Sequence, residues 1–469
     1  MDLHLYNSLT HKKELFTPID SPIVRLYSCG ITAYDYPHIG NFRAYLTQDV
    51  IRRTLSYLGY ETLHAMNVTD VGHLTSDASE GDDKIEKRAQ ERGVDPLELA
   101  RQYEAVFWND LEAFNIMKPD RVLRASDAID QQIQLIEKLF EKDAAYVTAH
   151  AIYFDVTKAK DYGALSGQHT EDKLTGVRDE VVVDPDKRNS ADFVLWFFIV
   201  GRYEKHILRW ESPWGVGFPG WHLECSAISR ELLGQPFDIH LGGIDHIPVH
   251  HTNEIAQSQT AYDTPLANYW IHNNFITIDG QKMSKSLNNT YTHQDLIDNG
   301  ISPMAFRYFS LNAHYRSQQN VTWQALHDAQ DAYRHLLEYA YILHTDVNSE
   351  AQGDTVMYVD RFTKALTNDV NAPEALASAW ALVKDTSIAP LSRYATLLSF
   401  DDVLGLSIAE SIVEFNNVPE AISQLARERE EARQKKDYEK ADQLRDEIAS
   451  HGYDLRDTPN GPIIFPKMV

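Results

Sequence analysis

The sequence has 469 residues, of which 43% are hydrophobic, and its formal net charge is −25 at pH 7. This length allows about two or three domains with full cores, and no apolar run approaches the roughly 20 residues that span a membrane. The acidic balance excludes a nonspecific basic nucleic-acid binder, although a local patch can still bind RNA. Charges at the N-terminus replace the apolar segment of a signal peptide, so we expect a cytoplasmic protein with no membrane partner.

After an entry arm over residues 1–22, the chain predicts a strand, a helix and a second strand. Ile23–Tyr27 is largely apolar, Asn41–Leu58 carries its apolar residues on one helical stripe, and Glu61–Val68 is again an apolar strand. Two such strands joined by a helix predict a parallel sheet whose ligand site lies at the carboxyl ends of the strands. We therefore predict an α/β fold with a Rossmann-type nucleotide-binding domain.

The predicted helix opens with the tetrapeptide His38-Ile39-Gly40-Asn41. His38 and Asn41 are i,i+3 neighbours on one face, next to backbone N–H groups that have no partner within the helix. These groups and the helix dipole favour a bound phosphate. Taken alone, the tetrapeptide fits a capped helix entry with a solvated histidine equally well.

The middle of the chain holds mixed signals. Residues 96–143 show helical periodicity, and about 125–210 read as a short insertion of short strands and a polar loop. Residues 215–220 spell G-x-G-x-x-G, but Pro219 blocks the helix that a dinucleotide fingerprint needs. We interpret this stretch as a turn into a helix that begins near Trp221.

The chain has two cysteines, Cys29 after the first strand and Cys225 in the first turn of that later helix. Without an export signal a disulfide is not expected, and a buried inert thiol is the ordinary interpretation. Downstream, His250 and Glu254 are i,i+4 on one face of a helix that starts after Pro248. Two thiolates, one imidazole and one carboxylate form a four-ligand set that zinc accepts.

A second histidine pair in this region has the same spacing. His246 precedes His250 by four residues, but Pro248 lies between them and disfavours a shared helix. We therefore prefer His250 with Glu254 as the downstream ligand pair.

A lysine- and serine-rich pentapeptide follows the predicted apolar strand Trp270–Ile278 and an Asp-Gly turn signal. Its ammonium groups suit the neutralisation of charge that builds on a phosphate during displacement at phosphorus. A solvated turn is the alternative, and the pairing with the HIGN helix entry favours the catalytic interpretation. The pentapeptide consists of Lys282, Met283, Ser284, Lys285 and Ser286.

The rest of the chain is predicted to be mostly helical. Residues 419–449 predict two short amphipathic helices, and 450–469 predict a strand and turn. Between these and the pentapeptide, apolar periodicity predicts a helical bundle from three stretches, 322–345, 355–385 and 388–405.

The HIGN and KMSKS sequences resemble the HIGH and KMSKS signatures of class I aminoacyl-tRNA synthetases. The HIGN form with Cys29-Gly30 upstream is similar to the cysteinyl-tRNA synthetase family. The resemblance covers the whole chain and implies ATP-dependent activation of L-cysteine, with Mg²⁺, and transfer to tRNA(Cys) by a monomer. The domains it implies are a catalytic domain over 1–320 with its KMSKS region at about 270–320, a helical bundle over 321–405 and an anticodon-recognition domain over 406–469.

The resemblance also implies a role for individual residues. One zinc ion per chain would receive the substrate thiolate, and its ligands would be Cys29, Cys225, His250 and Glu254. The groups that bind cysteine would be Gly30, Thr69, Trp221 and Asp245, the last of them holding the ammonium group. The residues that bind ATP would be Thr32, His38, Gly40, Asn41 and 282–286. The catalytic residues among them would be His38, Asn41, Lys282 and Lys285.

A zinc ion in this pocket has a physical reason. Serine differs from cysteine by one atom, so pocket shape gives little discrimination, whereas coordination strongly favours a thiolate over a neutral hydroxyl. The sequence also departs from the family pattern in the acidic 72–84 loop and at Pro248, Thr252 and Asn288. None of these positions is a predicted zinc ligand.

Two other functions fit the same motifs. A ligase that gives activated cysteine to an amino-sugar acceptor shares the catalytic domain, and the predicted RNA-binding tail argues against it. A non-enzymatic zinc- or RNA-binding paralogue is the other alternative, and the intact KMSKS lysines argue against that.

Overall fold

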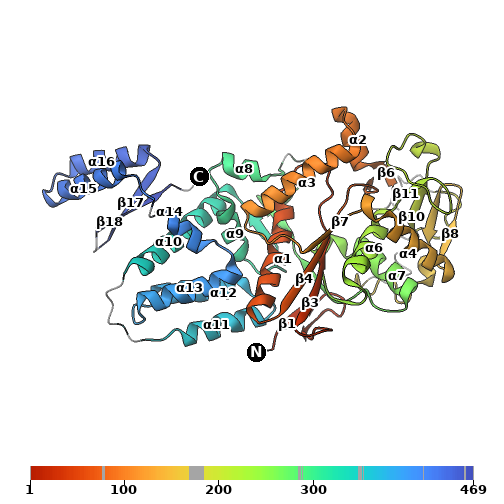
Figure 1. Cartoon of the computed structure of the whole chain (residues 1–469), viewed down its shortest axis with the longest axis horizontal. Coiled ribbons are helices and arrows are strands. Elements are labelled where there is room, and N and C mark those ends of the chain that lie inside the picture. The colour runs from red at the N-terminus through yellow and green to blue at the C-terminus, as the bar shows by residue number, and fades with distance from the viewer. Residues whose placement is uncertain are drawn as a thin grey trace.

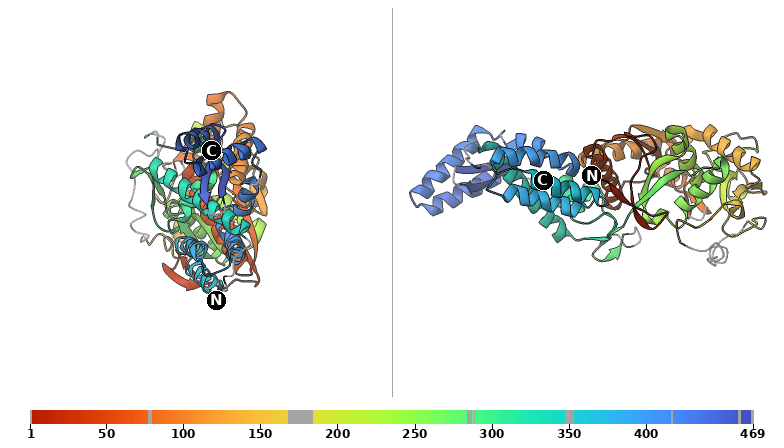
Figure 2. Two further views of the ribbon diagram at one scale, coloured as in Figure 1. Left: turned by 90° about the vertical axis from the view of Figure 1, so that its left-hand side faces the viewer. Right: turned by 90° about the horizontal axis from the view of Figure 1, so that it is seen from below.

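The chain is elongated, with an antiparallel sheet at one end and a small helical and hairpin unit at the other (Figure 1). Seen from below, it is long and narrow (Figure 2). The computed structural model describes residues 2–76, 80–167, 184–283, 287, 289–346, 351, 353–415, 417–458 and 461–467.

A five-stranded sheet in the order β13-β12-β3-β4-β7 forms the centre of the molecule, and all neighbouring strands in it are parallel. From β3 the chain runs outward to β4 and β7, and then returns to the other side of β3 with β12. The crevice between β3 and β12 is therefore the topological switch point at which such sheets bind ligands. The strands are β3 (Ile23–Ser28), β4 (Glu61–Val68), β7 (Arg121–Arg124), β12 (Phe237–Gly243) and β13 (Ala267–Asn273).

Helix α1 (Ile39–Tyr57) connects β3 to β4 and confirms the predicted α/β unit. Its apolar stripe, which includes Phe42, Leu46 and Ile51, is buried against the core. Gly59 follows the helix with φ +90°, a backbone conformation that glycine adopts without strain. Together with the parallel sheet, this unit confirms the predicted fold class.

The insertion forms the sheet β11-β10-β9-β8, whose neighbouring strands are antiparallel. Next to it pack three helices, of which α6 and α7 carry several of the predicted site residues (Figure 1). The strands are β8 (Ala145–Val147), β9 (Ala151–Phe154), β10 (Phe193–Phe198) and β11 (Gly217–Pro219), and the helices are α4 (Ile129–Glu141), α6 (Trp221–Leu233) and α7 (His250–Tyr262).

Smaller elements complete this part of the chain. Two hairpins, β1 (His4–Asn7) with β2 (Lys12–Leu15) and β5 (Leu74–Ser76) with β6 (Glu80–Asp83), are separate from the central sheet. A third small sheet contains β14 (Ile276–Ile278), β15 (Gln281–Lys282) and β16 (Gln319–Val321). Among the residues that the structure describes, this part also contains the helices α2 (Lys84–Arg92), α3 (Pro96–Ala113), α8 (His293–Asp298) and α9 (Pro303–Leu311).

The C-terminal third is helical and ends in a projecting unit (Figure 1). The bundle helices are α10 (Trp323–Thr345), α11 (Val356–Thr367), α12 (Ala372–Lys384), α13 (Pro390–Leu404) and α14 (Ile408–Phe415). The projecting unit consists of α15 (Glu420–Gln434), α16 (Tyr438–Ser450) and the hairpin β17 (Tyr453–Thr458) with β18 (Gly461–Pro466).

Three predicted elements differ from the structure. Arg121–Arg124, within a stretch expected to be helical, is strand β7, because it pairs with β4 at the edge of the central sheet. The single strand expected over Trp270–Ile278 is divided between two sheets, since Asn274 Oδ1 accepts the N–H of Phe275 and turns the chain. The helix expected over 355–385 is two helices, separated by a turn in which Asp369 and Val370 have positive φ.

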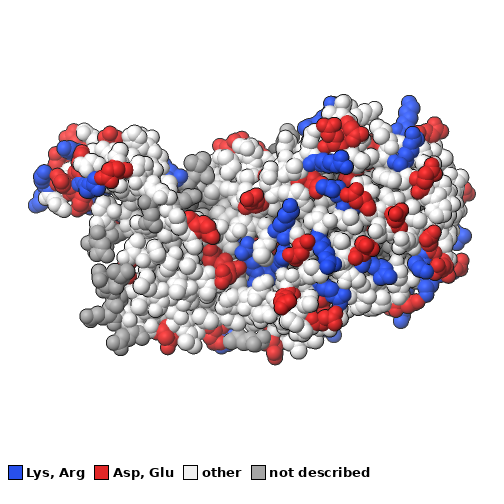
Figure 3. Space-filling view, viewed as in Figure 1, with Lys and Arg blue, Asp and Glu red and all other residues white. Residues whose placement is uncertain are grey.

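Charged side chains of both signs are interspersed over the face shown in Figure 3. No helix of the described residues is long and apolar enough to cross a membrane. The surface therefore shows no single basic stripe on this face that would bind nucleic acid without specificity.

A buried ion pair joins α1 to the helical part of the chain. Arg307 on α9 is fully buried and donates to Asp49 Oδ2 on α1 at 2.5 Å. It also donates to the carbonyl groups of Leu404, Phe114 and Asn115. Burial alone would raise the pKa of Asp49, but Arg307, Arg53 and the N–H of Met117 together more than offset this and the pKa is lowered. The pair is fully hydrogen-bonded, which is the condition for burying charges at acceptable cost.

We predict that Arg307→Met lowers the free energy of unfolding by about 3–5 kcal/mol, because it leaves the Asp49 carboxylate buried without its main partner. Urea unfolding followed by tryptophan fluorescence measures the effect. The matched control is Lys364→Met, which breaks an exposed i,i+4 pair with Asp360 and should change the free energy by less than about 0.5 kcal/mol. A loss for Arg307→Met as small as that of the control would show that the buried pair is unimportant.

Candidate active site and metal cluster

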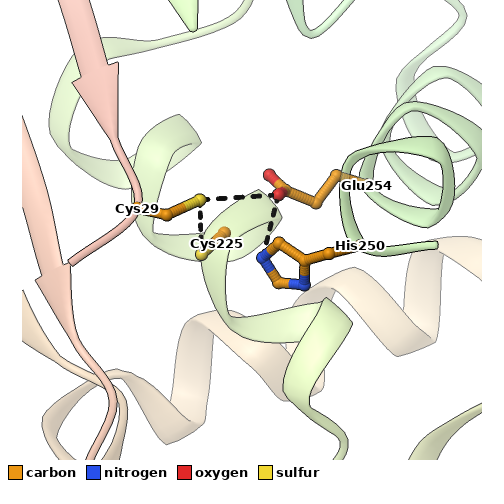
Figure 4. Close-up of side chains that lie close together, drawn as sticks. All are labelled: Cys29, Cys225, His250 and Glu254. Carbon is orange, nitrogen blue, oxygen red and sulfur yellow. Dashed lines mark hydrogen bonds and ion pairs between the residues drawn. The ribbon is translucent and has the colours of Figure 1, made fainter. Parts of the chain in front are cut away.

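The four predicted metal ligands lie together at the switch point of the central sheet (Figure 4). Cys29 follows β3, Cys225 lies one turn into α6, and His250 and Glu254 share one face of α7. The two sulfur atoms are 3.8 Å apart, which is a contact between free thiols and too long for a disulfide. Glu254 Oε1 lies 3.9 Å from Cys29 Sγ and 3.1 Å from His250 Nε2.

The geometry and chemistry of this cluster fit a metal ion. One ligand atom from each of the four residues lies within 4.8 Å of the others; Cys225, His250 and Glu254 are almost fully buried, and Cys29 is 8% exposed. His250 Nε2 has no hydrogen-bond partner among the described residues, although it is close enough to Glu254 for an ion pair. A buried set of two thiols and a carboxyl group is costly to ionise without a cation, and a bound divalent metal ion would supply that charge.

The pKa values of the four clustered residues also indicate that the pocket lacks positive charge. Burial raises the pKa of Glu254 well above its usual value, and burial together with Cys29 raises the pKa of Cys225 in the same direction. Burial alone would raise the pKa of Cys29 as well, but the Cys225 thiol and His246 more than offset this and lower it to about 6. Burial lowers the pKa of His250, so its imidazole is neutral, as a metal ligand must be.

A second group of possible metal ligands shares two members with the first. It was not predicted from the sequence. It consists of Cys29, His240, His251 and Glu254. His240 Nε2 lies 3.0 Å from Glu254 Oε2, and His251 Nε2 lies 3.3 Å from Cys29 Sγ. His240 thus binds the oxygen of Glu254 that faces away from His250, which orients the carboxylate. The first group keeps both thiols, so it is the better zinc site.

The structure brings the predicted cysteine-binding residues to the same crevice. The N–H of Gly30 donates to Asn67 Oδ1 at 2.8 Å, and Thr69 Oγ1 donates to Glu224 Oε1 at 2.8 Å. Trp221 stacks on the ring of His250 at a centroid distance of 4.1 Å. The Trp221 ring therefore borders the metal cluster directly.

Two further residues complete this crevice. Asp245 lies in a single 3₁₀ turn after β12, and its side chain is 58% exposed, so it is accessible to a substrate. Glu224, which the sequence reasoning did not select, is fully buried beneath Thr69, and burial raises its pKa to about 8. Its position directly before Cys225 was the only sequence signal for it.

The predicted nucleotide-binding tetrapeptide forms a reciprocal cap at the start of α1. Asn41 N donates to His38 Nδ1 at 3.2 Å, and His38 N donates to Asn41 Oδ1 at 3.0 Å. Because Nδ1 accepts a hydrogen bond, the ring hydrogen of neutral His38 is on Nε2. Both interpretations of the tetrapeptide are thus compatible: the side chains cap the helix, and Nε2–H remains the donor end of the ring.

The start of the predicted KMSKS loop lies next to this helix entry. The N–H of Ile39 donates to the carbonyl of Tyr291, just after the loop. A Cβ on Gly40 would lie 3.6 Å from Met283 Sδ, so Met283 is also close to α1. Lys282 is in β15, with its ammonium 5.9 Å from the Phe275 ring centroid. Ser284, Lys285, Ser286 and Asn288 lie outside the described residues.

Comparison with known proteins identifies the family. Residues 15–331 match the family of class I (C) tRNA synthetase catalytic domains. Residues 416–461 match the cysteinyl-tRNA ligase anticodon binding domain. A cysteine-tRNA ligase of Burkholderia lata is 42% identical over 466 residues, which cover 99% of this chain and 97% of that protein. The chain belongs to the cysteine-tRNA ligase family of class I aminoacyl-tRNA synthetases.

Other members of the cysteine-tRNA ligase family match over a similar length. The protein of Treponema denticola is 39% identical over 488 residues, covering 97% of this chain and 98% of its own. Among solved structures, methionyl-tRNA synthetase of Mycobacterium tuberculosis has a TM-score of 0.56 at 16% identity and covers 85% of this chain and 95% of its own. At that identity the likeness concerns the fold, and it agrees with the parallel sheet described above.

We predict that Cys225→Ser and His250→Ala each reduce bound zinc from about one ion per chain to well below half, because each removes one of four ligands. Elemental analysis of the purified proteins measures the metal. His251→Ala is the matched control, since it removes a member of the second group only. Loss of zinc in His251→Ala with retention in Cys225→Ser would reverse the assignment.

Proposed function

We propose that this chain activates L-cysteine with ATP and transfers the cysteinyl group to tRNA(Cys). The observation that supports this most strongly is the cluster of Cys29, Cys225, His250 and Glu254 at the switch point of a parallel sheet, beside the capped start of α1. A soft, thiol-selecting pocket and a phosphate-binding helix entry are the two devices that cysteine activation needs. The matches to a class I catalytic domain and a cysteinyl-tRNA ligase anticodon domain are in agreement.

The four clustered residues would hold one zinc ion. When bound, the ion would bind the deprotonated thiol of cysteine far better than the hydroxyl of serine, which is the discrimination that pocket shape cannot supply. His240 would hold the second oxygen of Glu254 and so fix the carboxylate toward the other ligands. Trp221, stacked on His250, would form one wall of the pocket.

The remaining groups would bind the polar parts of the substrates. Asp245 offers an exposed carboxylate for the cysteine ammonium group. The N-terminus of α1 and His38 Nε2–H would bind ATP phosphates. Lys282 and Lys285 would stabilise the charge that builds on the α-phosphate as the cysteine carboxylate attacks it and pyrophosphate leaves. Holding both substrates in line would supply much of the remaining acceleration.

The acceptor in this proposal is tRNA, and the match of residues 416–461 to an anticodon binding domain argues against an amino-sugar acceptor. The projecting unit of α15, α16 and the β17–β18 hairpin would contact the anticodon at a distance from the chemistry (Figure 1). A monomeric state, a cytoplasmic location and Mg²⁺ as the partner of ATP stay predictions from the sequence.

Cysteine-dependent ATP–pyrophosphate exchange tests the proposal. We expect exchange with cysteine and well below about 1% of that rate with serine, because a shape-based pocket alone reaches discrimination of only about 10². The full-length protein should also transfer labelled cysteine to tRNA(Cys). Exchange without transfer to tRNA would favour the amino-sugar ligase, and absence of exchange would contradict enzymatic activity.

Lys285→Ala is the loss-of-function control for this assay. It should lower the exchange rate by on the order of 10²-fold, while cysteine affinity changes little, since the lysine acts on charge that develops in the transition state. Equal losses of affinity and rate would assign the loop to ground-state binding instead.

A further inference from the structure

His73 connects the two parts of the proposed active site. It lies in the acidic 72–84 stretch, is 8% exposed, and packs its ring flat on Trp221 at a centroid distance of 4.0 Å and an interplanar angle of 7°. Its Nδ1 lies 2.7 Å from Thr32 Oγ1, and its Nε2 lies 2.6 Å from Lys84 Nζ. One ring thus contacts the wall of the cysteine pocket and a residue predicted to bind ATP.

The hydrogen bonds that join Lys84, His73 and Thr32 all run in the same direction, from the lysine to the threonine. A lysine ammonium only donates, so Nε2 of His73 accepts from Lys84 and the ring hydrogen is on Nδ1. Nδ1–H then donates to Thr32 Oγ1. The hydroxyl of Thr32 has no other hydrogen bond among the described residues, and its own hydrogen is available to an acceptor in the crevice.

Thr32 lies where such an acceptor would be. It follows β3 and forms a parallel bridge with Thr69 after β4, and the N–H of Ala33 donates to the Thr69 carbonyl at 3.0 Å. Thr32 is therefore at the carboxyl ends of two adjacent strands, three residues beyond Cys29 and six before His38. Along the chain, Thr32 lies between Cys29 of the cluster and His38 at the start of α1.

We propose that Lys84 and His73 are positioning residues that fix the Thr32 hydroxyl as a hydrogen-bond donor to the anionic centre formed where the cysteine carboxylate meets the α-phosphate. The inference rests on the proposed function. The fixed charge of Lys84 polarises the two hydrogen bonds in series, which strengthens the last donor. Because the donor is already oriented, its use costs no reorganisation when charge develops on the phosphate.

The backbone around His73 holds the chain of contacts in place. Gly72 has φ +77°, and a Cβ there would lie 2.3 Å from the carbonyl oxygen of Pro219, just before Trp221. Asp83 Oδ2 accepts the N–H of Gly72 at 2.7 Å, and the N–H of Lys84 donates to the carbonyl of His73 at 3.0 Å. These bonds close the β5–β6 hairpin so that its two ends meet at the active site. The acidic 72–84 stretch therefore brings a base and a cation to the crevice.

A double-mutant cycle in the full-length protein tests the proposal. The variants are Lys84→Met, Thr32→Val and both together, and the readouts are kcat and KM for ATP and cysteine in the exchange assay. We expect Lys84→Met to lower kcat by on the order of 10-fold, with each KM changed less than about threefold. In the Thr32→Val background the further effect of Lys84→Met should fall below about twofold, because the lysine acts through that hydroxyl.

Two variants separate hydrogen bonding from packing. His73→Phe keeps a ring against Trp221 and loses both hydrogen bonds, so it should lower kcat as much as Lys84→Met does. Thr32→Ser retains the hydroxyl and should recover most of the rate lost in Thr32→Val. The matched control is Lys87→Met, at an exposed position on the same helix, which should leave kcat and both KM values unchanged.

Zinc content and the thermal midpoint distinguish positioning from a structural brace. Both should remain near the values of the unaltered protein in Lys84→Met and His73→Phe. Additive losses in the cycle, an unchanged kcat in Lys84→Met, or a loss of rate that follows loss of zinc or of the thermal midpoint would overturn the proposal. If the unaltered protein itself showed no cysteine-dependent exchange, the proposed function would fail, and with it the proposed role of Lys84, His73 and Thr32.

Discussion

The proposed active site depends on two thiols and a carboxylate that share one buried pocket. Ionising these groups there is unfavourable unless a positive charge lies beside them. Cys29, Cys225 and Glu254 come from three different elements, and burial raises the pKa of two of the three groups. The low pKa of Cys29 shows how strongly its polar neighbours favour a thiolate there. A divalent cation would resolve this conflict, because its charge would offset the cost of ionising these groups in the protein interior.

The fold explains why these groups meet. The strand order places β12 beside β3, so the segments after both strands line one crevice although more than 200 residues separate them in the chain. Helices α6 and α7 pack against each other at this point and contribute one thiol and the imidazole–carboxylate pair. The capped start of α1 follows the same strand, β3, as Cys29, so a helix end of the kind that binds phosphate is near the thiols in the chain.

Much of this could be predicted from the sequence because the signals were local. The periodicity of Asn41–Leu58 between two apolar strands indicated the parallel βαβ unit, and the i,i+4 spacing of His250 and Glu254 indicated a shared helix face. Long-range contacts were not visible in that way. In the sequence, His240 is simply one position of an apolar strand. Its hydrogen bond to Glu254 depends on how β12 packs against α7. The helix predicted over Arg121–Arg124 was wrong for a related reason, because only pairing with β4 makes this segment strand β7.

If the buried cluster selects the thiol of cysteine through a bound cation, calorimetric binding of cysteine and serine before and after metal removal will show it. With metal, cysteine should bind more tightly than serine by on the order of 10³-fold or more, beyond the roughly 10²-fold that shape gives for such similar side chains. After removal, the preference should fall to about 10²-fold or less, while the fold persists, because a core of this size does not depend on one metal. A metal-free protein that kept its full preference for cysteine would show that a bound cation does not select the thiol.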